Sequence, residues 1–313
     1  MCKLFIIGNG FDLAHHLPTS YGNFRNFLYR YATMNPDDEY NFTVPQVYTN
    51  PEGVFSIDES DATVFLYNLL DNTENIGDNW QDFEGALGRL NFEAVFDDNF
   101  AEVYDHEGDL NPFHTAYNRE DMSNSIHESC DLISNIFTDW IQSICLDNTV
   151  PLEALSRLFD RNSLFLTFNY TRTLEEVYQV PEENICHIHG SVGKTLVVGH
   201  GLSDIEMNNL YDFYERSFIG AEDALFQTIR DLRKPVEFLL QLNQNFFDRL
   251  NNITDIYSYG FSFSDVDLPY IRRICEAVNK NSIIWHQYSY KNSDYTDVIR
   301  NCGFNGNIEF WKE

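Results

Sequence analysis

The chain contains two kinds of hydrophobic pattern, one typical of buried strands and one typical of amphipathic helices. Short apolar runs without a helical period, bounded by glycine or polar residues, predict buried strands. They occupy residues 3–8, 163–168, 185–188, 195–199, 255–263, 282–290 and 307–311. Helical patterns at 268–279 and 293–301 separate the later runs, so the C-terminal third favours a parallel sheet.

Long stretches with apolar side chains at helical spacing separate the first predicted strand from the second. These patterns cover residues 19–34, 61–71, 79–105 and 120–147, with a loop-rich segment at 35–60. We therefore expect a single α/β domain over residues 1–313, with helical insertions at approximately 35–150 and approximately 203–251. The fold class that this layout predicts is α/β, with a mostly parallel sheet and large helical insertions.

Composition and charge exclude several classes of protein. The 313 residues are 43% hydrophobic, which is enough for a large core. A net charge of −29 argues against a surface that binds nucleic acid or an anionic membrane. The six cysteines form no CxxC pair, and the sequence has neither a signal-peptide pattern nor a run of 18 apolar residues. We expect a cytoplasmic protein that holds no structural zinc.

Two polar side chains that could bind a ligand or act in catalysis follow predicted strands. Asn169 comes after the run at 163–168, and His189 comes after the run at 185–188. Parallel strands bind ligands at their carboxyl ends. An asparagine amide can hold a water molecule or a ribose hydroxyl, and histidine can act as a general base near neutral pH. The alternative is that Asn169 forms a turn and His189 is structural, as we expect for His187 within the strand.

A glycine turn follows the first predicted strand. Gly8 and Gly10 would permit a tight turn and the close approach of a phosphate or ribose. The dinucleotide fingerprint requires a third glycine where this chain has Leu13, and an acidic residue that 28–34 lacks. A dehydrogenase is therefore disfavoured. Asp12 could contact ribose, accept a backbone N–H or cap a helix.

Several segments resemble motifs of the sirtuin (SIR2-like) superfamily. Gly8-Asn9-Gly10 with Leu17-Pro18 is similar to the sirtuin GAG turn, and Thr167 to Thr171 is similar to the T-Q-N-I-D segment. His189-Gly190 matches the motif of the catalytic histidine, and Gly260-Phe261-Ser262 matches a later G-x-S turn.

A closer resemblance is to the AbiH family of bacterial abortive-infection proteins. The segments that carry it are GNGFDLAHHLPTSYGNF (8–24), WQDFE (80–84), FNYTRTLEEVY (168–178), HIHG (187–190), GH (199–200) and GFSFSDVDLPY (260–270). They span most of the chain. The resemblance implies a Rossmann-like (SIR2-like) fold, a role in antiphage defence and NAD as substrate or ligand, without a metal.

The resemblance also implies roles for individual residues. Asn169 would orient ribose and water, and His189 would be the base. A second group would line the NAD pocket: Gly8, Asn9, Gly10, Asp12, Thr167, Gly190, Gly260 and Ser262. Additional candidates are Glu84, which would lean over the pocket or be a solvated helix carboxylate, and His200, which lies between glycines.

Departures from the sirtuin pattern leave more than one function open. The zinc module with two CxxC pairs is absent, which disfavours protein deacylation, and Thr171 replaces an aspartate. We expect an NAD glycohydrolase that releases nicotinamide and ADP-ribose. The alternatives are a catalytically silent sensor of NAD or ADP-ribose, and a partner-binding defence component. A phage-derived or host trigger and a homo-oligomer are the expected partners.

Overall fold

A computed structural model of the chain describes residues 2–32, 42–49, 55–73, 80–100, 102–278, 283–288 and 293–312. The chain forms two compact units. One, here called the sheet unit, comprises Met1–Ser20, Trp140–Val197 and Pro235–Glu313. The other, the helical unit, comprises Tyr21–Asp139 and Val198–Lys234. No helix among the described residues is long and apolar enough to cross a membrane.

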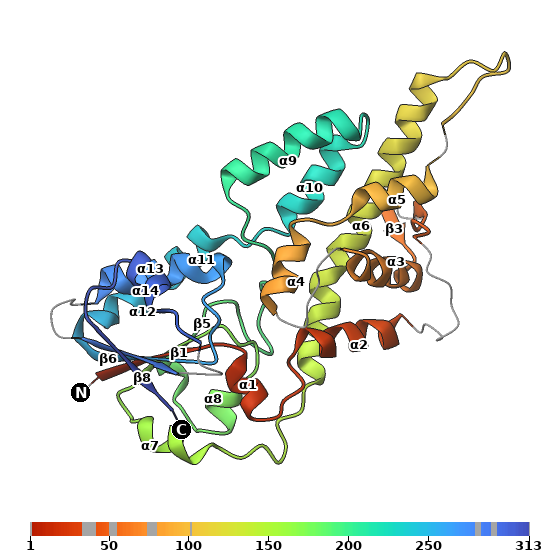
Figure 1. Ribbon diagram of the computed structural model, residues 1–313. Helices are drawn as coiled ribbons and strands as arrows, with labels where there is room; N and C mark the ends of the chain where they lie inside the picture. The colour runs from red at the N-terminus through yellow and green to blue at the C-terminus, as the bar shows by residue number, and fades with distance from the viewer. Residues whose placement is uncertain are drawn as a thin grey trace. The chain divides into compact units, whose positions relative to one another are not determined.

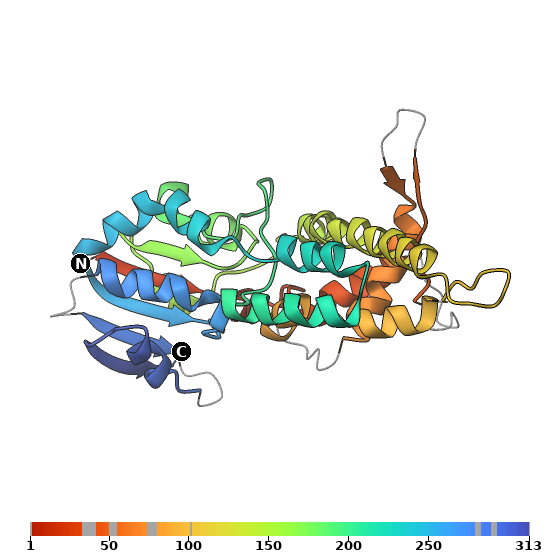
Figure 2. The ribbon, with the colours of Figure 1, turned by 90° about the horizontal axis from the view of Figure 1, so that it is seen from above.

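The sheet unit is built on six parallel strands in the order β5-β4-β1-β6-β7-β8. In chain order they are β1 (Cys2–Ile7), β4 (Leu164–Thr167), β5 (Ile185–His187), β6 (Ile253–Tyr259), β7 (Ile284–Tyr288) and β8 (Asn307–Trp311). The chain builds outward from β1 in one direction and then in the other (Figures 1 and 2). This is the strand order of doubly wound nucleotide-binding folds, so the predicted Rossmann-like α/β class is confirmed.

Helices cover both faces of this sheet because β1 is apolar on both sides. Leu4 and Ile6 face one cluster, and Phe5 and Ile7 face the other. Complete burial of each such side chain contributes about 2 kcal/mol, which explains why β1 is central. The first face packs against α11 (Val236–Leu242), α12 (Gln244–Asp248), α13 (Leu268–Ala277) and α14 (Thr296–Asn301). The second packs against α1 (Gly10–Ala14), α7 (Glu153–Leu158) and α8 (Thr173–Glu176).

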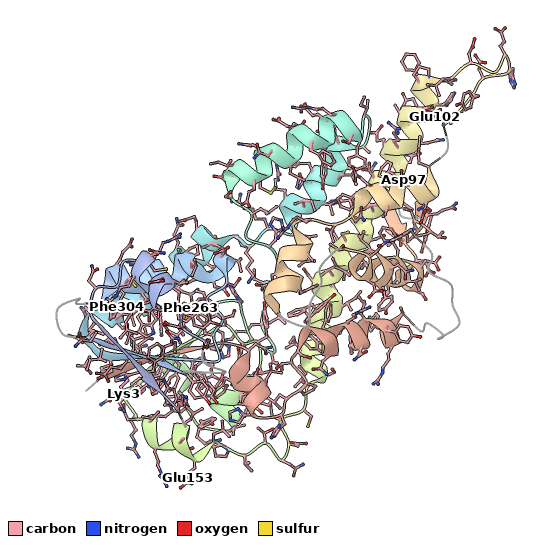
Figure 3. The ribbon with its side chains drawn as sticks, in the orientation of Figure 1. Lys3, Asp97, Glu102, Glu153, Phe263 and Phe304 are labelled. Carbon is pink, nitrogen blue, oxygen red and sulfur yellow. The ribbon has the colours of Figure 1, made fainter. Side chains whose placement is uncertain are left out.

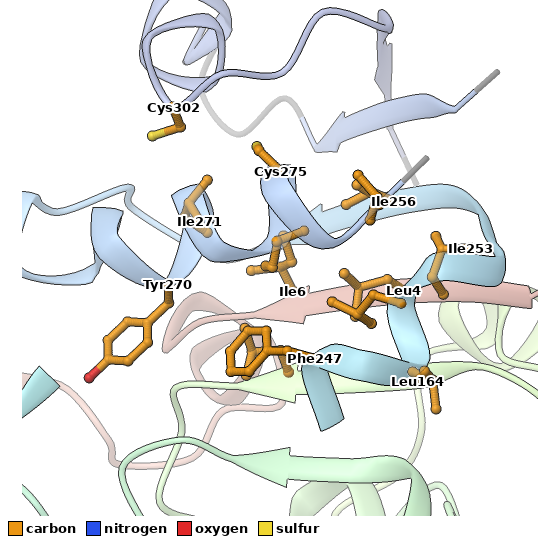
Figure 4. Packing of buried hydrophobic residues seen from close by; sticks show 14 of the residues in the cluster. Leu4, Ile6, Leu164, Phe247, Ile253, Ile256, Tyr270, Ile271, Cys275 and Cys302 are labelled. Carbon is orange, nitrogen blue, oxygen red and sulfur yellow. The ribbon is translucent and has the colours of Figure 1, made fainter. Parts of the chain in front are cut away.

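The first face holds the larger cluster. Figure 4 shows Leu4 and Ile6 of β1 beside Ile271 of α13 and Phe247 of α12. Aromatic side chains also contribute to this cluster, among them Phe263 and Phe304, which Figure 3 labels.

The helical unit contains α2 (Tyr21–Tyr31), α3 (Glu59–Asp71), α4 (Trp80–Leu87), α5 (Phe92–Asn99), α6 (Pro112–Ser143), α9 (Asp204–Ser217), α10 (Glu222–Asp231) and the hairpin of β2 (Val47–Thr49) with β3 (Phe55–Ile57). Polar caps start three of these helices. Asp58 and Asn91 accept hydrogen bonds from the backbone at the starts of α3 and α5, and Ser203 forms a capping box with Glu206 at the start of α9. Phe24, Phe83 and Phe137 pack edge to face in its core.

Several element predictions differ from the structure. The run at 195–199 was predicted as a strand but forms no regular structure, and beside it only His200 makes an isolated bridge, to Arg233. Leu196 and Val198 are nevertheless buried, so the apolar pattern reflected burial alone. The helical pattern at 79–105 splits into α4 and α5. The pattern at 120–147 starts earlier, at Pro112, as α6, and much of 35–60 lies outside the described residues.

The ends of β1 and β6 are in direct main-chain contact. Gly8 N–H donates to Tyr259 O at 3.1 Å, and Gly10 N–H donates to Gly260 O at 2.9 Å. A Cβ at Gly8 would lie 2.5 Å from Gly260 O, and a Cβ at Gly10 would lie 2.6 Å from Gly260 Cα. Gly260 has a φ of +61°, and its Cβ would lie 2.4 Å from Phe11 N. Only glycine permits this approach on both sides.

Gly260→Ala should therefore destabilise the sheet unit strongly. The matched control is Gly303→Ala, since Gly303 has a φ of +97° but no heavy atom within 4 Å of its Cβ position. The control should lower the free energy of unfolding by about 1 kcal/mol, because alanine is disfavoured in a left-handed backbone conformation. Gly260→Ala should lower it by about 2 kcal/mol more, because the added methyl group also clashes with main-chain atoms. Equal losses in urea unfolding would contradict this account.

Candidate functional site

The carboxyl ends of four strands bring most of the predicted site residues to one edge of the sheet. The register pairs Ile7 with Thr167 and with Tyr259, and pairs Thr167 with His187. The candidate residues follow these positions directly: the glycine turn after β1, Asn169 after β4, His189 after β5 and Gly260 after β6. This edge lies where the strand order reverses, which is the place where open α/β sheets bind ligands.

Asn169 has a fixed main chain and an amide with no hydrogen-bond partner within 3.5 Å in the described part of the chain, although the amide is close enough to Asp12 to lower the pKa of that carboxyl group. Its N–H donates to Thr167 Oγ1 at 3.1 Å, and its carbonyl oxygen lies 3.0 Å from His187 Nδ1. The residue is only 6% exposed, yet neither polar atom of its side chain has a hydrogen-bond partner among the described residues. A buried polar group in that state costs about 1–3 kcal/mol. Such a cost is typical of a site that a ligand completes.

His189 is buried among aromatic rings and faces a carboxylate. The rings of Phe168 and Tyr270 lie at 5.5 Å from its ring centroid, both edge to face. Its Nε2 lies 3.8 Å from Oδ1 of Asp267, the residue that precedes α13. This distance is longer than a hydrogen bond but short enough for the carboxylate to stabilise a protonated imidazole.

Asp267 is a candidate site residue that the sequence reasoning did not identify. It stands in the segment GFSFSDVDLPY, from which only the glycine and Ser262 were selected. The available signal was its position just before a helix at the carboxyl edge of the sheet. Ser262 in the same turn is exposed, whereas Asp267 is buried.

Asp12 is a buried carboxyl group held by two threonines. It is 1% exposed, and it accepts hydrogen bonds from Thr171 at 2.7 Å and from Thr173 at 2.9 Å. Burial raises the pKa of Asp12 to about 6, although these hydroxyls, the nearby Asn169 amide and His187 oppose the increase. Asp12 lies inside α1 and does not cap it, so the capping interpretation is not what the structure shows.

At several predicted site positions, close contacts within the chain leave room only for glycine. Gly8 and Gly10 pack on Gly260, so their missing side chains make room for the main chain itself. Gly190 has a φ of +84°, and its Cβ would lie 2.0 Å from Thr195 O. Asn9, which lies between the two glycines of the turn, donates a hydrogen bond from Nδ2 to the main-chain oxygen of Thr19 at 2.9 Å.

The two additional candidates lie in the helical unit. Glu84 Oε1 on α4 lies 2.5 Å from Nζ of the buried Lys234. His200 is fully buried, with Nε2 2.7 Å from Ile229 O and Nδ1 accepting from Leu202 N–H at 3.1 Å. Burial lowers the pKa of His200 to about 4, so it stays neutral at physiological pH. Both side chains are thus engaged in structural contacts of their own unit.

One group of side chains among the described residues has the donor types of a metal site. His127 Nε2 on α6 lies 3.9 Å from a carboxylate oxygen of Asp131 and 3.9 Å from one of Asp231. Both aspartates are exposed, and this arrangement equally suits a protonated histidine between two acids. The expectation that the reaction needs no metal stays a prediction.

The raised pKa of Asp12 predicts a pH dependence of stability. Between the ordinary aspartate pKa and about 6 the folded state binds more protons than the unfolded state, so the free energy of unfolding falls as pH rises. Asp12→Asn removes the cost of ionising this buried carboxyl group. In urea unfolding, the free energy of unfolding of the variant relative to wild type should therefore increase by about 1.4 kcal/mol from pH 5 to pH 8. The control Asp265→Asn, at an exposed position, should show no such trend. Parallel pH profiles for wild type and Asp12→Asn would contradict the burial argument.

Comparisons with known proteins place the chain in one family. The family model described as "Bacteriophage abortive infection AbiH" matches residues 4–289. That range includes β4, β5, β6 and most of β1, together with the site residues that follow them. Searches of curated proteins and of solved structures found no match. The chain therefore belongs to the AbiH family of bacteriophage abortive infection proteins.

Proposed function

We propose that this AbiH protein binds NAD at the carboxyl edge of its sheet and hydrolyses it to nicotinamide and ADP-ribose. The observation that supports this most is the Asn169 amide, which is buried at the point where the strand order reverses and has no hydrogen-bond partner among the described residues. A ribose diol would supply the acceptor and donor that the amide lacks. The nearby His189 provides a group that can accept a proton.

The chemistry needs few protein groups because the nicotinamide of NAD is already a cationic leaving group. The bond between its ring nitrogen and ribose C1′ breaks, and nicotinamide leaves as a neutral molecule with the bonding electron pair. Water attacks C1′, and His189 takes one proton from it. Asn169 orients the ribose and the water. The carboxylate of Asp267, 3.8 Å from His189 Nε2, stabilises the imidazolium that forms.

The departure from the sirtuin pattern at Thr171 has a local explanation under this proposal. Sirtuins carry an aspartate at that position, and here the Thr171 hydroxyl donates to the carboxyl group of Asp12. A carboxyl group is thus retained beside Asn169, supplied by α1.

A second function, binding without turnover, is favoured by the burial of the reactive groups. Asn169 is 6% and His189 is 2% exposed. Water and NAD reach such groups only after a local opening, so a sensor that binds nucleotide and responds through a partner fits the same edge of the sheet. Product analysis separates the two functions.

The direct test compares Asn169→Ala and His189→Ala with wild type for NAD consumption and product formation. Each variant should reduce turnover by about 100-fold or more, because each removes a group acting on the ribosyl centre. Stabilisation against heat by ADP-ribose should persist in His189→Ala. The matched control is His286→Ala, which removes a histidine held by Asp255 at 3.1 Å elsewhere in the sheet. Turnover unchanged in both site variants would refute these roles, and ADP-ribose binding without turnover in wild type would favour the sensor.

Asp267→Asn tests the partner assigned to His189. The variant keeps the size of the side chain but loses the charge that stabilises the imidazolium, so kcat should fall about tenfold with KM little changed. Asp265→Asn, two residues earlier and exposed, is the control and should behave as wild type. If Asp267→Asn also retains wild-type kcat across pH 6–9, Asp267 does not act through His189.

A further inference from the structure

His187 is half-buried, with both ring nitrogens next to oxygen atoms. Nδ1 lies 3.0 Å from the main-chain carbonyl oxygen of Asn169, and Nε2 lies 3.0 Å from Oε1 of Glu175 on α8. The side chains of His187 and Glu175 are only 9% and 8% exposed.

The contact with Asn169 fixes the proton on one nitrogen of the ring. A carbonyl oxygen can only accept, so Nδ1 must carry the proton that it shares with Asn169. The contact of Nε2 with Glu175 holds the opposite side of the ring, so the imidazole is oriented from both sides.

Glu175 is an acid whose ionised form is favoured at this place. Burial raises the pKa of Glu175, but its contact with His187 outweighs this effect and leaves the pKa lowered. Arg172 also favours ionised Glu175. Glu175 is therefore an acceptor that can hold the His187 ring in place.

These contacts bear directly on the side chain proposed to orient ribose. The main chain of Asn169 is held on both sides, by Thr167 Oγ1 at its N–H and by His187 at its carbonyl. With φ and ψ restrained in this way, the Cα–Cβ bond that carries the amide has a fixed direction before a ligand arrives. Preorganised groups of this kind contribute to catalysis by avoiding reorganisation during the reaction.

We propose that His187 is a positioning residue, held by Glu175 at Nε2, which fixes the main chain of Asn169 for ligand binding through Nδ1. These contacts concern the protein alone. The consequence for catalysis rests on the proposed NAD hydrolysis.

The contact is tested first, without any substrate. Nitrogen-15 NMR of the histidine rings, with the His187 signal identified by its loss in His187→Asn, should show a proton on Nδ1 that is hydrogen-bonded to the Asn169 carbonyl. Glu175→Gln should shift the Nε2 signal, whereas Glu176→Gln, the adjacent and exposed control, should not. A His187 ring without a proton on Nδ1 in wild type would overturn the proposal, whatever the protein does with NAD.

The positioning role is tested by a substitution that keeps one contact. In His187→Asn the side-chain amide can still donate to the Asn169 carbonyl in place of Nδ1, whereas His187→Ala removes both contacts. We expect kcat to fall about tenfold or more in His187→Ala, with KM changed less than threefold, and to recover most of that loss in His187→Asn. The control for general destabilisation is again His286→Ala, which should keep wild-type kcat.

Failure of the two ideas can be distinguished. If wild type does not consume NAD, the proposed hydrolysis fails, and calorimetric titration with ADP-ribose replaces kcat as the readout, with weaker binding expected in His187→Ala and recovery in His187→Asn. If NAD is consumed but His187→Ala matches wild type, or loses no more than His286→Ala, the positioning role fails while the hydrolysis stands.

Discussion

The main-chain contact between the β1 turn and Gly260 is the constraint on which the rest of the site depends. Two glycines on one side and one on the other allow the ends of adjacent strands to approach within hydrogen-bond distance. Because β1 is central and the strand order reverses there, this contact fixes the starting point of α1. It thereby places Asp12 beneath the turn that follows β4.

The polar groups at this edge form two buried networks that meet at Asn169. Asp12 is held by the hydroxyls of Thr171 and Thr173, and its raised pKa records how far it is removed from water. Glu175 is held by His187. Buried acids are costly unless they are paired. Their concentration around one amide without partners is what distinguishes this edge from an ordinary α/β core.

The sequence was sufficient for the sheet and for the carboxyl edge, because short apolar runs bounded by glycine identify buried strands. It failed at 195–199, where apolar side chains pack without forming a strand. Asn169 and His189 were found from their positions after strands. Asp267 was missed because its proximity to His189 depends on tertiary structure. The ligand-binding role of Gly8, Gly10 and Gly260 stays a prediction, and the structure adds a second reason for these glycines, because they pack on each other. That second reason depends on backbone distances that no sequence pattern contains.

The most direct test of the central claim is a crystal structure of the His189→Ala variant grown with NAD. Our account predicts the nicotinamide ribose at the carboxyl ends of β4 and β5, with a ribose hydroxyl hydrogen-bonded to the Asn169 amide. NAD bound elsewhere, or contacts that leave this amide without a partner in the bound state, would contradict it.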